Sequence, residues 1–469
     1  MFVNRIAELR LLEQRYASDQ AELFVLYGRR RVGKTELLAH FCADKRHIFY
    51  VADLATESTL RAGLSAAVGA VQFGADAPAP VYSSWEDLFT ALARLAQTER
   101  LVVVLDEFPY LVAAHPPLAS VLQRLWDHVL SKTQVMLILC GSYIGMMEET
   151  VLSYRAPLYG RRTAQYLLEP LDFSAAQLFY PQFVPEDRVR AYAIFGGTPA
   201  YLKVINRNQP LATNIEQNIL MRGAFLYDEV RFVLQQELRE PRNYFAVLQA
   251  IASGRTQLNE IKQATGLDSV MAYLDTLQQL HLVERVVPVT ETQPHKSRRG
   301  LYRLKDQFLR FWFRFVHPNR SQLERNGSAQ VLADAVLPDL DQFTGPVFEN
   351  VCQQFLWHAG QDSQLPLIPK QIGGWWRANE EIDLIAFDDD TALLTECKWT
   401  SRPVGIDVLA DLERKATLIL PELAARHVRY ALCARSGFTE QLKQIAIDRM
   451  DVHLFDLADI VEDGNSVNW

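Results

Sequence analysis

The chain has 469 residues, of which 49% are hydrophobic and 22% are charged, so its composition is that of a globular protein with roughly two to four domains. A formal net charge of −8 argues against a protein whose whole surface binds nucleic acid, and it leaves room for a local basic patch. No apolar run approaches the roughly 18 residues of a membrane span, and the N-terminus lacks the basic-then-apolar plan of a signal peptide, so no membrane partner is expected.

The five cysteines are scattered along the chain, at Cys42, Cys140, Cys352, Cys397 and Cys433. No pair has the C-x₂-C spacing of a zinc site, and their density is too low for a disulfide scaffold. We therefore expect a reduced, cytoplasmic protein.

Residues 1–168 alternate short apolar runs with segments of helical periodicity, which predicts a parallel sheet covered by helices, an α/β fold. The Ala/Pro-rich residues 74–80 indicate a loop, and from residue 169 to 239 the pattern becomes helical and suggests a lid. Three apolar runs are the clearest strands: residues 23–26, 101–105 and 135–139.

The segment from Gly28 to Thr35 fits the P-loop pattern G-x-x-x-x-G-K-[ST], and it stands between an apolar strand and a helix over residues 35–42. Gly28 and Gly33 allow the backbone N–H groups to wrap phosphates, and the helix N-terminus adds positive potential. Lys34 would reach the β- and γ-phosphates, and the Thr35 hydroxyl would ligate Mg²⁺. The motif predicts binding of ATP with Mg²⁺.

The run L-V-V-V-L-D-E over residues 101–107 supplies the second half of a nucleotide site, because a buried strand there delivers two adjacent acids to its carboxyl end. Asp106 would hold Mg²⁺ through water, and Glu107 would polarise the attacking water. Alone, the pair fits a solvated acidic turn equally well; together with the P-loop it favours an ATPase.

Ser142 follows the third buried strand, where it would sense the γ-phosphate or cap the next helix. Arg161 and Arg162 would supply a positive charge to the transition state, within this chain or from a neighbour in a homo-oligomer, or they are simply solvated.

The chain resembles the archaeal-type ATPases of the STAND class, within the AAA-like P-loop ATPases. The resemblance rests on the two nucleotide motifs and three further segments: F-V-N-R at 2–5 with Glu8-Leu9, Y-G-R-R at 159–162, and G-G-T-P-A-Y-L at 196–202. It implies that Val3, Asn4, Arg5 and Pro199 lie against the adenine. The residues themselves indicate only a non-helical turn at Gly-Gly-Thr-Pro.

Residues 240–320 predict a winged helix-turn-helix, with three helices followed by a hairpin that has a basic tip. The helices are expected over residues 244–253, 258–265 and 269–280, and the strands over 282–287 and 301–304. Residues 281–314 hold eight Lys or Arg and three acids, so Lys296, Arg298 and Arg299 are candidates for phosphate contacts with DNA. The alternative is an internal packing module, because residues 269–280 contain no Lys or Arg. Residues 321–335 are expected to be a linker.

Residues 335–469 form a third domain, with strands expected over 381–387 and 392–399 around an acidic turn, and a helix over 347–357. Alternation along a strand places Glu396 and Lys398 on one face of the same strand. Two charged side chains in an apolar strand are energetically costly unless both serve a function. Asp383 on the neighbouring strand can face them. Two carboxylates and an amine there make a Mg²⁺ site with a positioned water.

These residues resemble the PD-(D/E)xK nuclease superfamily, and the whole chain looks like archaeal ATPases with a C-terminal DUF234 domain. The resemblance implies that Asp383, Glu396 and the Cys397 carbonyl hold the metal, that Lys398 orients the water, and that Glu349 assists. The chain departs from the pattern at 379–381, where Asn-Glu-Glu replaces a Pro-Asp dipeptide. The alternatives are a salt-bridged exposed ribbon, a fold used only for binding, and a misassigned strand pair.

The leading hypothesis is an ATPase whose nucleotide state controls a metal-dependent nuclease-like domain acting on nucleic acid, with DNA as the expected substrate. The alternatives are an ATP-driven signalling switch and a DNA-binding regulator with an inactive nuclease fold.

Overall fold

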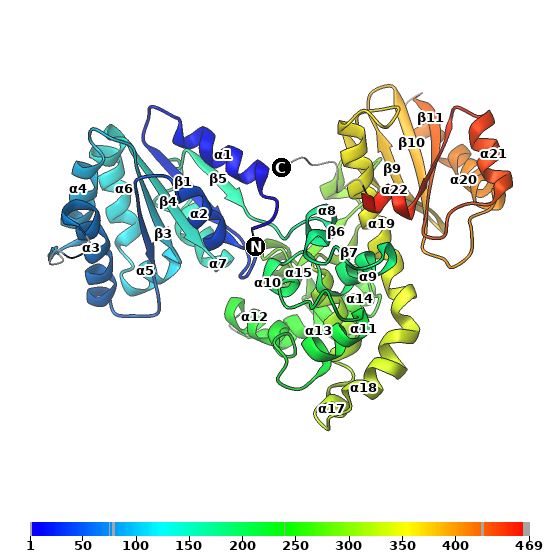
Figure 1. Cartoon of the computed structure of the whole chain (residues 1–469), viewed down its shortest axis with the longest axis horizontal. Helices are drawn as coiled ribbons and strands as arrows, with labels where there is room; N and C mark the ends of the chain where they lie inside the picture. Colours follow the sequence, from blue (N-terminus) through cyan, green and yellow to red (C-terminus); the bar gives the residue numbers. More distant parts are fainter. Residues whose placement is uncertain (1, 75, 77–79, 239, 424–425, 463–469) are drawn as a thin grey trace. The chain divides into compact units, whose positions relative to one another are not determined.

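The computed structural model describes residues 2–74, 76, 80–238, 240–423 and 426–462, and the chain divides into two compact units, Met1–Pro170 and Leu171–Trp469 (Figure 1). The loop expected over residues 74–80 lies largely outside the described residues. Among those described, no helix is both long enough and apolar enough to cross a membrane.

The first unit is built on a five-stranded parallel sheet with the order β2-β3-β4-β1-β5. Its strands are β1 (Glu22–Tyr27), β2 (His47–Val51), β3 (Leu101–Asp106), β4 (Val135–Gly141) and β5 (Ala164–Leu167). The three strands predicted from apolar runs are confirmed. Because β4 lies between β1 and β3, the carboxyl ends of these three strands meet at one edge of the sheet.

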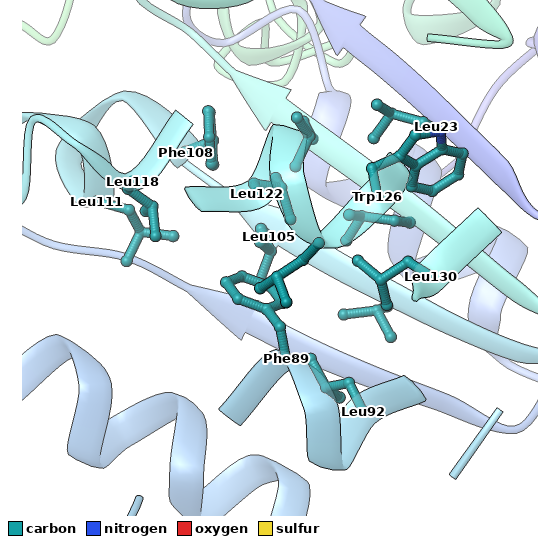
Figure 2. Close-up of a cluster of buried hydrophobic side chains, with 14 of the residues drawn as sticks. Leu23, Phe89, Leu92, Leu105, Phe108, Leu111, Leu118, Leu122, Trp126 and Leu130 are labelled. Carbon is teal, nitrogen blue, oxygen red and sulfur yellow. The ribbon is translucent and has the colours of Figure 1, made fainter. Parts of the chain in front are cut away.

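Helices cover both faces of this sheet, and alternation along the strands decides which side chain enters which core. In β1, Leu23 and Val25 pack on one side, and Phe24 and Leu26 on the other. The first side is covered by α3 (Glu57–Phe73), α4 (Trp85–Leu95), α5 (Phe108–Ala114) and α6 (Leu118–His128), the second by α1 (Ile6–Tyr16) and α2 (Lys34–Cys42). Figure 2 shows the first core, in which Phe89, Leu105, Leu122 and Trp126 lie together. The α/β fold is confirmed.

Helical elements flank β4 and open the second unit. They are η1 (Leu130–Lys132) before β4, then α7 (Ile144–Met147) and η2 (Glu148–Leu152), and in the second unit α8 (Phe173–Ala176), η3 (Gln177–Phe179), α9 (Pro185–Phe195), α10 (Pro199–Leu202), α11 (Leu211–Ile215), η4 (Glu216–Leu220) and α12 (Glu229–Glu237). The helical pattern expected for residues 169–239 is therefore present in the described part of that range.

Three helices and a two-stranded antiparallel sheet come next: α13 (Pro241–Ala252), α14 (Leu258–Thr265), α15 (Val270–Gln279), β6 (Val283–Val286) and β7 (Leu301–Leu304), with η5 (Pro294–Lys296) in the loop between the strands. We call residues 287–300 the hairpin loop. After β7 come α16 (Gln307–Phe311) and η6 (Trp312–Val316).

The expectation of a linker over residues 321–335 is wrong. This stretch is helical, in α17 (Arg320–Leu323), α18 (Ser328–Val331) and η7 (Leu332–Val336), and it runs into the 25-residue helix α19 (Leu337–Gln361). Leu323, Val331 and Val336 are buried. The segment looks polar because its few apolar residues are widely spaced, yet those few are sufficient to pack it against the rest of the second unit.

A mixed five-stranded sheet with the order β12-β11-β10-β9-β8 completes the second unit. Its strands are β8 (Gln371–Arg377), β9 (Glu380–Phe387), β10 (Thr391–Lys398), β11 (His427–Ala434) and β12 (Val452–Asp456), and its later helices are α20 (Ile406–Ile419), η8 (Leu420–Glu422), α21 (Glu440–Asp448) and α22 (Leu457–Glu462). Strands β8 to β10 are antiparallel, and β10 to β12 are parallel. Leu394 and Leu432 face α20, where they pack with Leu409 and Leu412. Helix α19 packs on β9 and β10 as well.

Candidate functional site

The P-loop joins β1 to α2 and needs glycine at both of its motif positions. Gly28 has a φ of 151°, and a Cβ there would stand 2.4 Å from the carbonyl oxygen of Leu168. Gly33 has a φ of 96° and immediately precedes α2. Both conformations are open to glycine and strained for other residues. The two glycines are therefore needed for the backbone shape of the loop.

Lys34 is buried inside this loop, where its Nζ donates to the carbonyl oxygens of Gly28 and Arg29, each at 2.9 Å. Burial lowers the pKa of its amine, and the nearby carboxylates of Asp106 and Glu107 oppose that effect. The carbonyl oxygens that hold the Lys34 amine carry no net charge and so do not neutralise it, and the loop therefore fits a phosphate group.

The carboxyl ends of β3 and β4 bring the catalytic candidates to the P-loop. The Thr35 hydroxyl donates to Asp106 Oδ2 at 2.6 Å, which places the two expected Mg²⁺ ligands side by side. The Ser142 hydroxyl lies 2.7 and 2.8 Å from the two carboxylate oxygens of Glu107, and the Ser142 N–H donates to the same group at 3.3 Å. Helix α7 begins without a side-chain cap, so Ser142 holds Glu107 and does not cap the helix.

The N-terminal segment is tied to the P-loop by Arg5. Its guanidinium donates to the carbonyls of Val32, at 3.0 Å, and Glu169, at 2.9 Å, and it pairs with Glu8 at 2.9 Å. Asn4 accepts a hydrogen bond from the Arg5 N–H. The Arg5 side chain thus braces the nucleotide loop.

The other residues expected near adenine are divided between the units. Val3 is buried in the first unit, whereas Pro199 begins α10 in the second. Close packing fixes the turn before it, because a Cβ on Gly197 would stand 1.7 Å from the Leu171 carbonyl oxygen. Contact of these residues with adenine stays a prediction.

Both arginines expected near the transition state have partners within the first unit. Arg161 pairs with Asp127 at 3.0 Å, and Arg162 donates to the carbonyls of Val151 and Leu152, at 3.1 and 2.8 Å. These contacts stabilise the segment after β4. A role in the transition state, in this chain or in trans, stays a prediction.

The acidic candidates meet at the ends of β9 and β10. Lys398 Nζ pairs with Glu396 Oε1 at 2.6 Å, so the two side chains share a face of β10 as alternation predicts. Asp383 Oδ2 accepts from the Cys397 N–H at 2.7 Å, which links the neighbouring strands. Glu396 Oε2 is buried and makes no hydrogen bond with the described residues; the Lys415 ammonium stands 3.5 Å away.

The carboxyl groups of this acidic site repel one another. Burial raises the pKa of Asp383 to about 7, with the charges of Glu396 and Glu349 adding to the effect. Burial also raises the pKa of Glu349, against the opposing charge of Arg303. Carboxylates that raise one another's pKa in this way form a site that a cation would stabilise.

Three basic residues near the acidic site were missed by sequence reasoning. Lys415 belongs to α20, next to its buried stripe, and Arg303 and Arg310 come from β7 and α16. Arg310 stacks over the Phe343 ring at 4.5 Å, and burial lowers its pKa to about 10. Of these three residues, only Lys415 could have been found from the sequence, because the amphipathic pattern of residues 406–419 places it at the edge of an apolar face.

The hairpin loop docks on β8 of the C-terminal sheet. Arg299 donates to the Trp376 carbonyl at 3.2 Å, and the Trp376 indole donates back to the Arg299 carbonyl at 3.0 Å. The Val289 N–H donates to the Gly374 carbonyl at 2.9 Å. Arg299 also pairs with Glu291 at 2.8 Å. Of the three residues expected to contact DNA, Lys296 and Arg298 are exposed and Arg299 holds this interface together.

Two protein families match different parts of the chain. Residues 2–205 match the model of an ATPase domain predominantly from Archaea, and residues 312–417 match DUF234, described as archaeal and bacterial proteins of unknown function. An uncharacterized protein of Methanocaldococcus jannaschii is 36% identical over 428 residues, which cover 89% of this chain and 92% of that protein.

The solved structures that are similar to the chain include two from Pyrococcus species. A Walker-type ATPase of Pyrococcus abyssi is 21% identical with a TM-score of 0.48, covering 67% of this chain and 96% of that one. A STAND protein with a tetratricopeptide repeat sensor from Pyrococcus horikoshii is 15% identical with a TM-score of 0.31, covering 77% and 51%.

Proposed function

Because the chain belongs to the archaeal-type ATPase family and carries a C-terminal DUF234 domain, we propose that its ATPase controls a metal-dependent nuclease-like centre at Asp383, Glu396 and Lys398. The substrate is a nucleic acid, with DNA as the expected one. The proposal also keeps the four predicted segments: the ATPase core over 1–168, the lid over 169–239, a winged helix over 240–320 and the nuclease-like domain over 335–469.

In the ATPase half, different residues bind the phosphates, hold the metal and orient the attacking water. Lys34 and the backbone of the P-loop bind the phosphates. Thr35 and Asp106 would hold Mg²⁺, which neutralises charge on the phosphates when bound. Glu107 orients the attacking water, and Ser142 keeps the Glu107 carboxylate in place through its hydroxyl and N–H.

The observation that carries the nuclease half is the constellation at β9 and β10. Asp383 and Glu396 offer hard oxygen donors, and Glu396 Oε2, which makes no hydrogen bond within the described part of the chain, fits a cation. With the Cys397 carbonyl they would hold a divalent metal, which supplies Lewis acidity to the phosphate. Lys398 holds the water that attacks phosphorus. As the water oxygen bonds to phosphorus, the bond from phosphorus to the leaving oxygen breaks. The attacking water gives up one proton to solvent, and the leaving oxygen takes up one proton from solvent.

The test incubates plasmid, linear DNA and RNA with the full chain, ATP, and Mg²⁺ or Mn²⁺. Lys398→Ala and Asp383→Asn are expected to lower cleavage by at least about 100-fold, because both act on the transition state. Lys370→Ala is the matched control, since Lys370 is exposed on the same domain. It should cut at the wild-type rate.

Cleavage that survives Lys398→Ala and Asp383→Asn contradicts the assignment. The same holds if ATP is turned over and no substrate is cut with either metal.

A signalling switch is the second candidate, and the docked hairpin loop favours it. Arg299 and Trp376 exchange two hydrogen bonds between the loop and β8, so part of the expected DNA-binding surface is an internal contact. In that function, nucleotide exchange changes an interaction surface and nothing is cut. ATP-dependent change in the hydrogen exchange of residues 287–300 without cleavage would support it.

A further inference from the structure

Three buried cysteines from three different elements meet in the C-terminal sheet domain. Cys352 lies on α19, Cys397 on β10 and Cys433 on β11, and their Sγ atoms all lie within 4.8 Å of one another. The strand register explains the meeting, because Cys397 is the direct partner of Cys433 in the parallel pair β10 and β11. Helix α19 then supplies the third thiol from the layer that packs on the sheet.

The thiols lie on the opposite face of β10 from the side chains of Glu396 and Lys398. Glu396 and Lys398 share the face toward α20, where Lys415 contacts Glu396. By alternation Cys397 points to the other face. Thr395 is the neighbouring residue on that same face, and it is fully buried with a hydroxyl that makes no hydrogen bond with the described residues.

A cluster of this kind has the chemistry of a soft metal site. Thiolates select thiophilic cations such as Zn²⁺ and Cu⁺. With metal–sulfur bonds of about 2.3 Å, the sulfur atoms of a trigonal or tetrahedral site stand about 4 Å apart. The observed upper limit of 4.8 Å allows that arrangement with side-chain adjustments alone.

We propose that Cys352, Cys397 and Cys433 bind one thiophilic d¹⁰ cation, Zn²⁺ or Cu⁺. Binding releases the thiol protons to solvent as the metal–sulfur bonds form. The Thr395 hydroxyl, which has no hydrogen-bond partner in the described structure, adds a polar group to this buried face of β10.

The position of the cluster gives the cation a structural consequence. It would join α19, β10 and β11, and the Cys397 N–H that faces Asp383 belongs to the same residue. A bound cation would therefore hold β10, the strand that carries Glu396 and Lys398, from its opposite face. The site itself does not depend on the proposed cleavage of nucleic acid.

The test uses the full chain produced with Zn²⁺ or Co²⁺ in the growth medium and purified under reducing conditions without chelators. Elemental analysis should find one metal ion per chain. The cobalt form should show the intense near-ultraviolet charge-transfer band of cobalt–thiolate bonds. In a second arm, reduced metal-free protein competes for Cu⁺ with a chromophoric chelator, which separates Cu⁺ from Zn²⁺ as the cation held.

Variants locate the site. Cys352→Ser and Cys433→Ser should each lower the bound metal at least tenfold and weaken the charge-transfer band. Cys42→Ser is the matched control, because Cys42 is a buried free thiol in the other unit. Asp383→Asn should keep the band, which separates the thiol site from the acidic site.

Absence of metal in the folded wild-type chain overturns the proposal, and so does binding that persists in both serine variants. Should those variants not fold, alkylation of the wild-type chain decides. The metal should protect these three cysteines and not Cys42 from a thiol reagent, as read by peptide mass spectrometry. Equal protection of all four would contradict a site.

Discussion

Replacing Arg5 with alanine should destabilise the first unit and weaken nucleotide binding together. The guanidinium serves three acceptors, the carbonyls of Val32 and Glu169 and the carboxylate of Glu8, and its side chain is 8% exposed. Val32 lies inside the P-loop. Loss of the side chain would therefore loosen the loop that binds phosphate and also the start of α1.

The size of the effect follows from these contacts. Hydrogen bonds that involve a charged group contribute about 1.5–3 kcal/mol each, and those made by one side chain do not simply add. Removing one partner of a largely buried pair leaves the charge of Glu8, which is 12% exposed, without its cation. We expect the free energy of unfolding of the first unit to fall by about 3 kcal/mol. Arg5→Lys should recover less than half of this, since one amine cannot reach all three acceptors.

Hydrogen exchange of peptides from β1 and α2 measures this opening free energy in the first unit alone. Arg10→Ala is the control, because Arg10 is exposed on α1, the helix that begins directly after Arg5, and it should change the value by less than about 0.5 kcal/mol. Nucleotide affinity should fall in Arg5→Ala and not in Arg10→Ala. If the two variants open with the same free energy, Arg5 does not brace the loop.

Three further outcomes test the site. Ser142→Ala removes the hydroxyl that holds Glu107, so ATP turnover should fall about 10–100-fold with little change in nucleotide affinity, as measured by steady-state kinetics and direct binding; an unchanged rate would remove Ser142 from the mechanism. Gly28→Ala forces a Cβ against the Leu168 carbonyl and should lower the midpoint of thermal unfolding of the first unit, and a stability equal to wild type would contradict the packing. Lys415→Met leaves Glu396 with one ammonium partner, so divalent-metal affinity measured by calorimetry should rise, whereas a fall would show that Lys415 helps to hold the metal site.

The nucleotide site was predictable because it is local. One strand, the eight-residue motif over 28–35 and the helix that this motif begins contain the whole phosphate-binding element, and each has its own sequence signal. The two acids after residues 101–105 could likewise be assigned to the nucleotide site, because the parallel strands of one sheet have their carboxyl ends at the same edge. The side-chain partners were not predictable. Arg5 was expected near adenine, and its contacts with two carbonyls depend on how the N-terminal segment crosses the loop.

Tertiary contacts explain what sequence reasoning missed in the second unit. The five cysteines look unrelated along the chain, and the register of β10 with β11 together with the packing of α19 brings three of them together. Residues 321–335 looked like a linker because local composition does not report a few well-placed apolar contacts. The basic hairpin loop looked like a nucleic-acid contact, and only the fold shows Arg299 against β8.

The most direct test of nucleotide control compares cleavage by the wild-type chain and by Lys34→Ala in one time course with labelled DNA, Mg²⁺ and ATP. Lys34 belongs to the first unit and the acidic site to the second. An effect of Lys34→Ala on cleavage would therefore mean that the nucleotide site of the first unit controls the acidic site of the second. The proposed control predicts ATP-dependent cleavage by the wild type and a rate in Lys34→Ala equal to that of wild type without nucleotide. Equal cleavage by both proteins, with or without ATP, would contradict it.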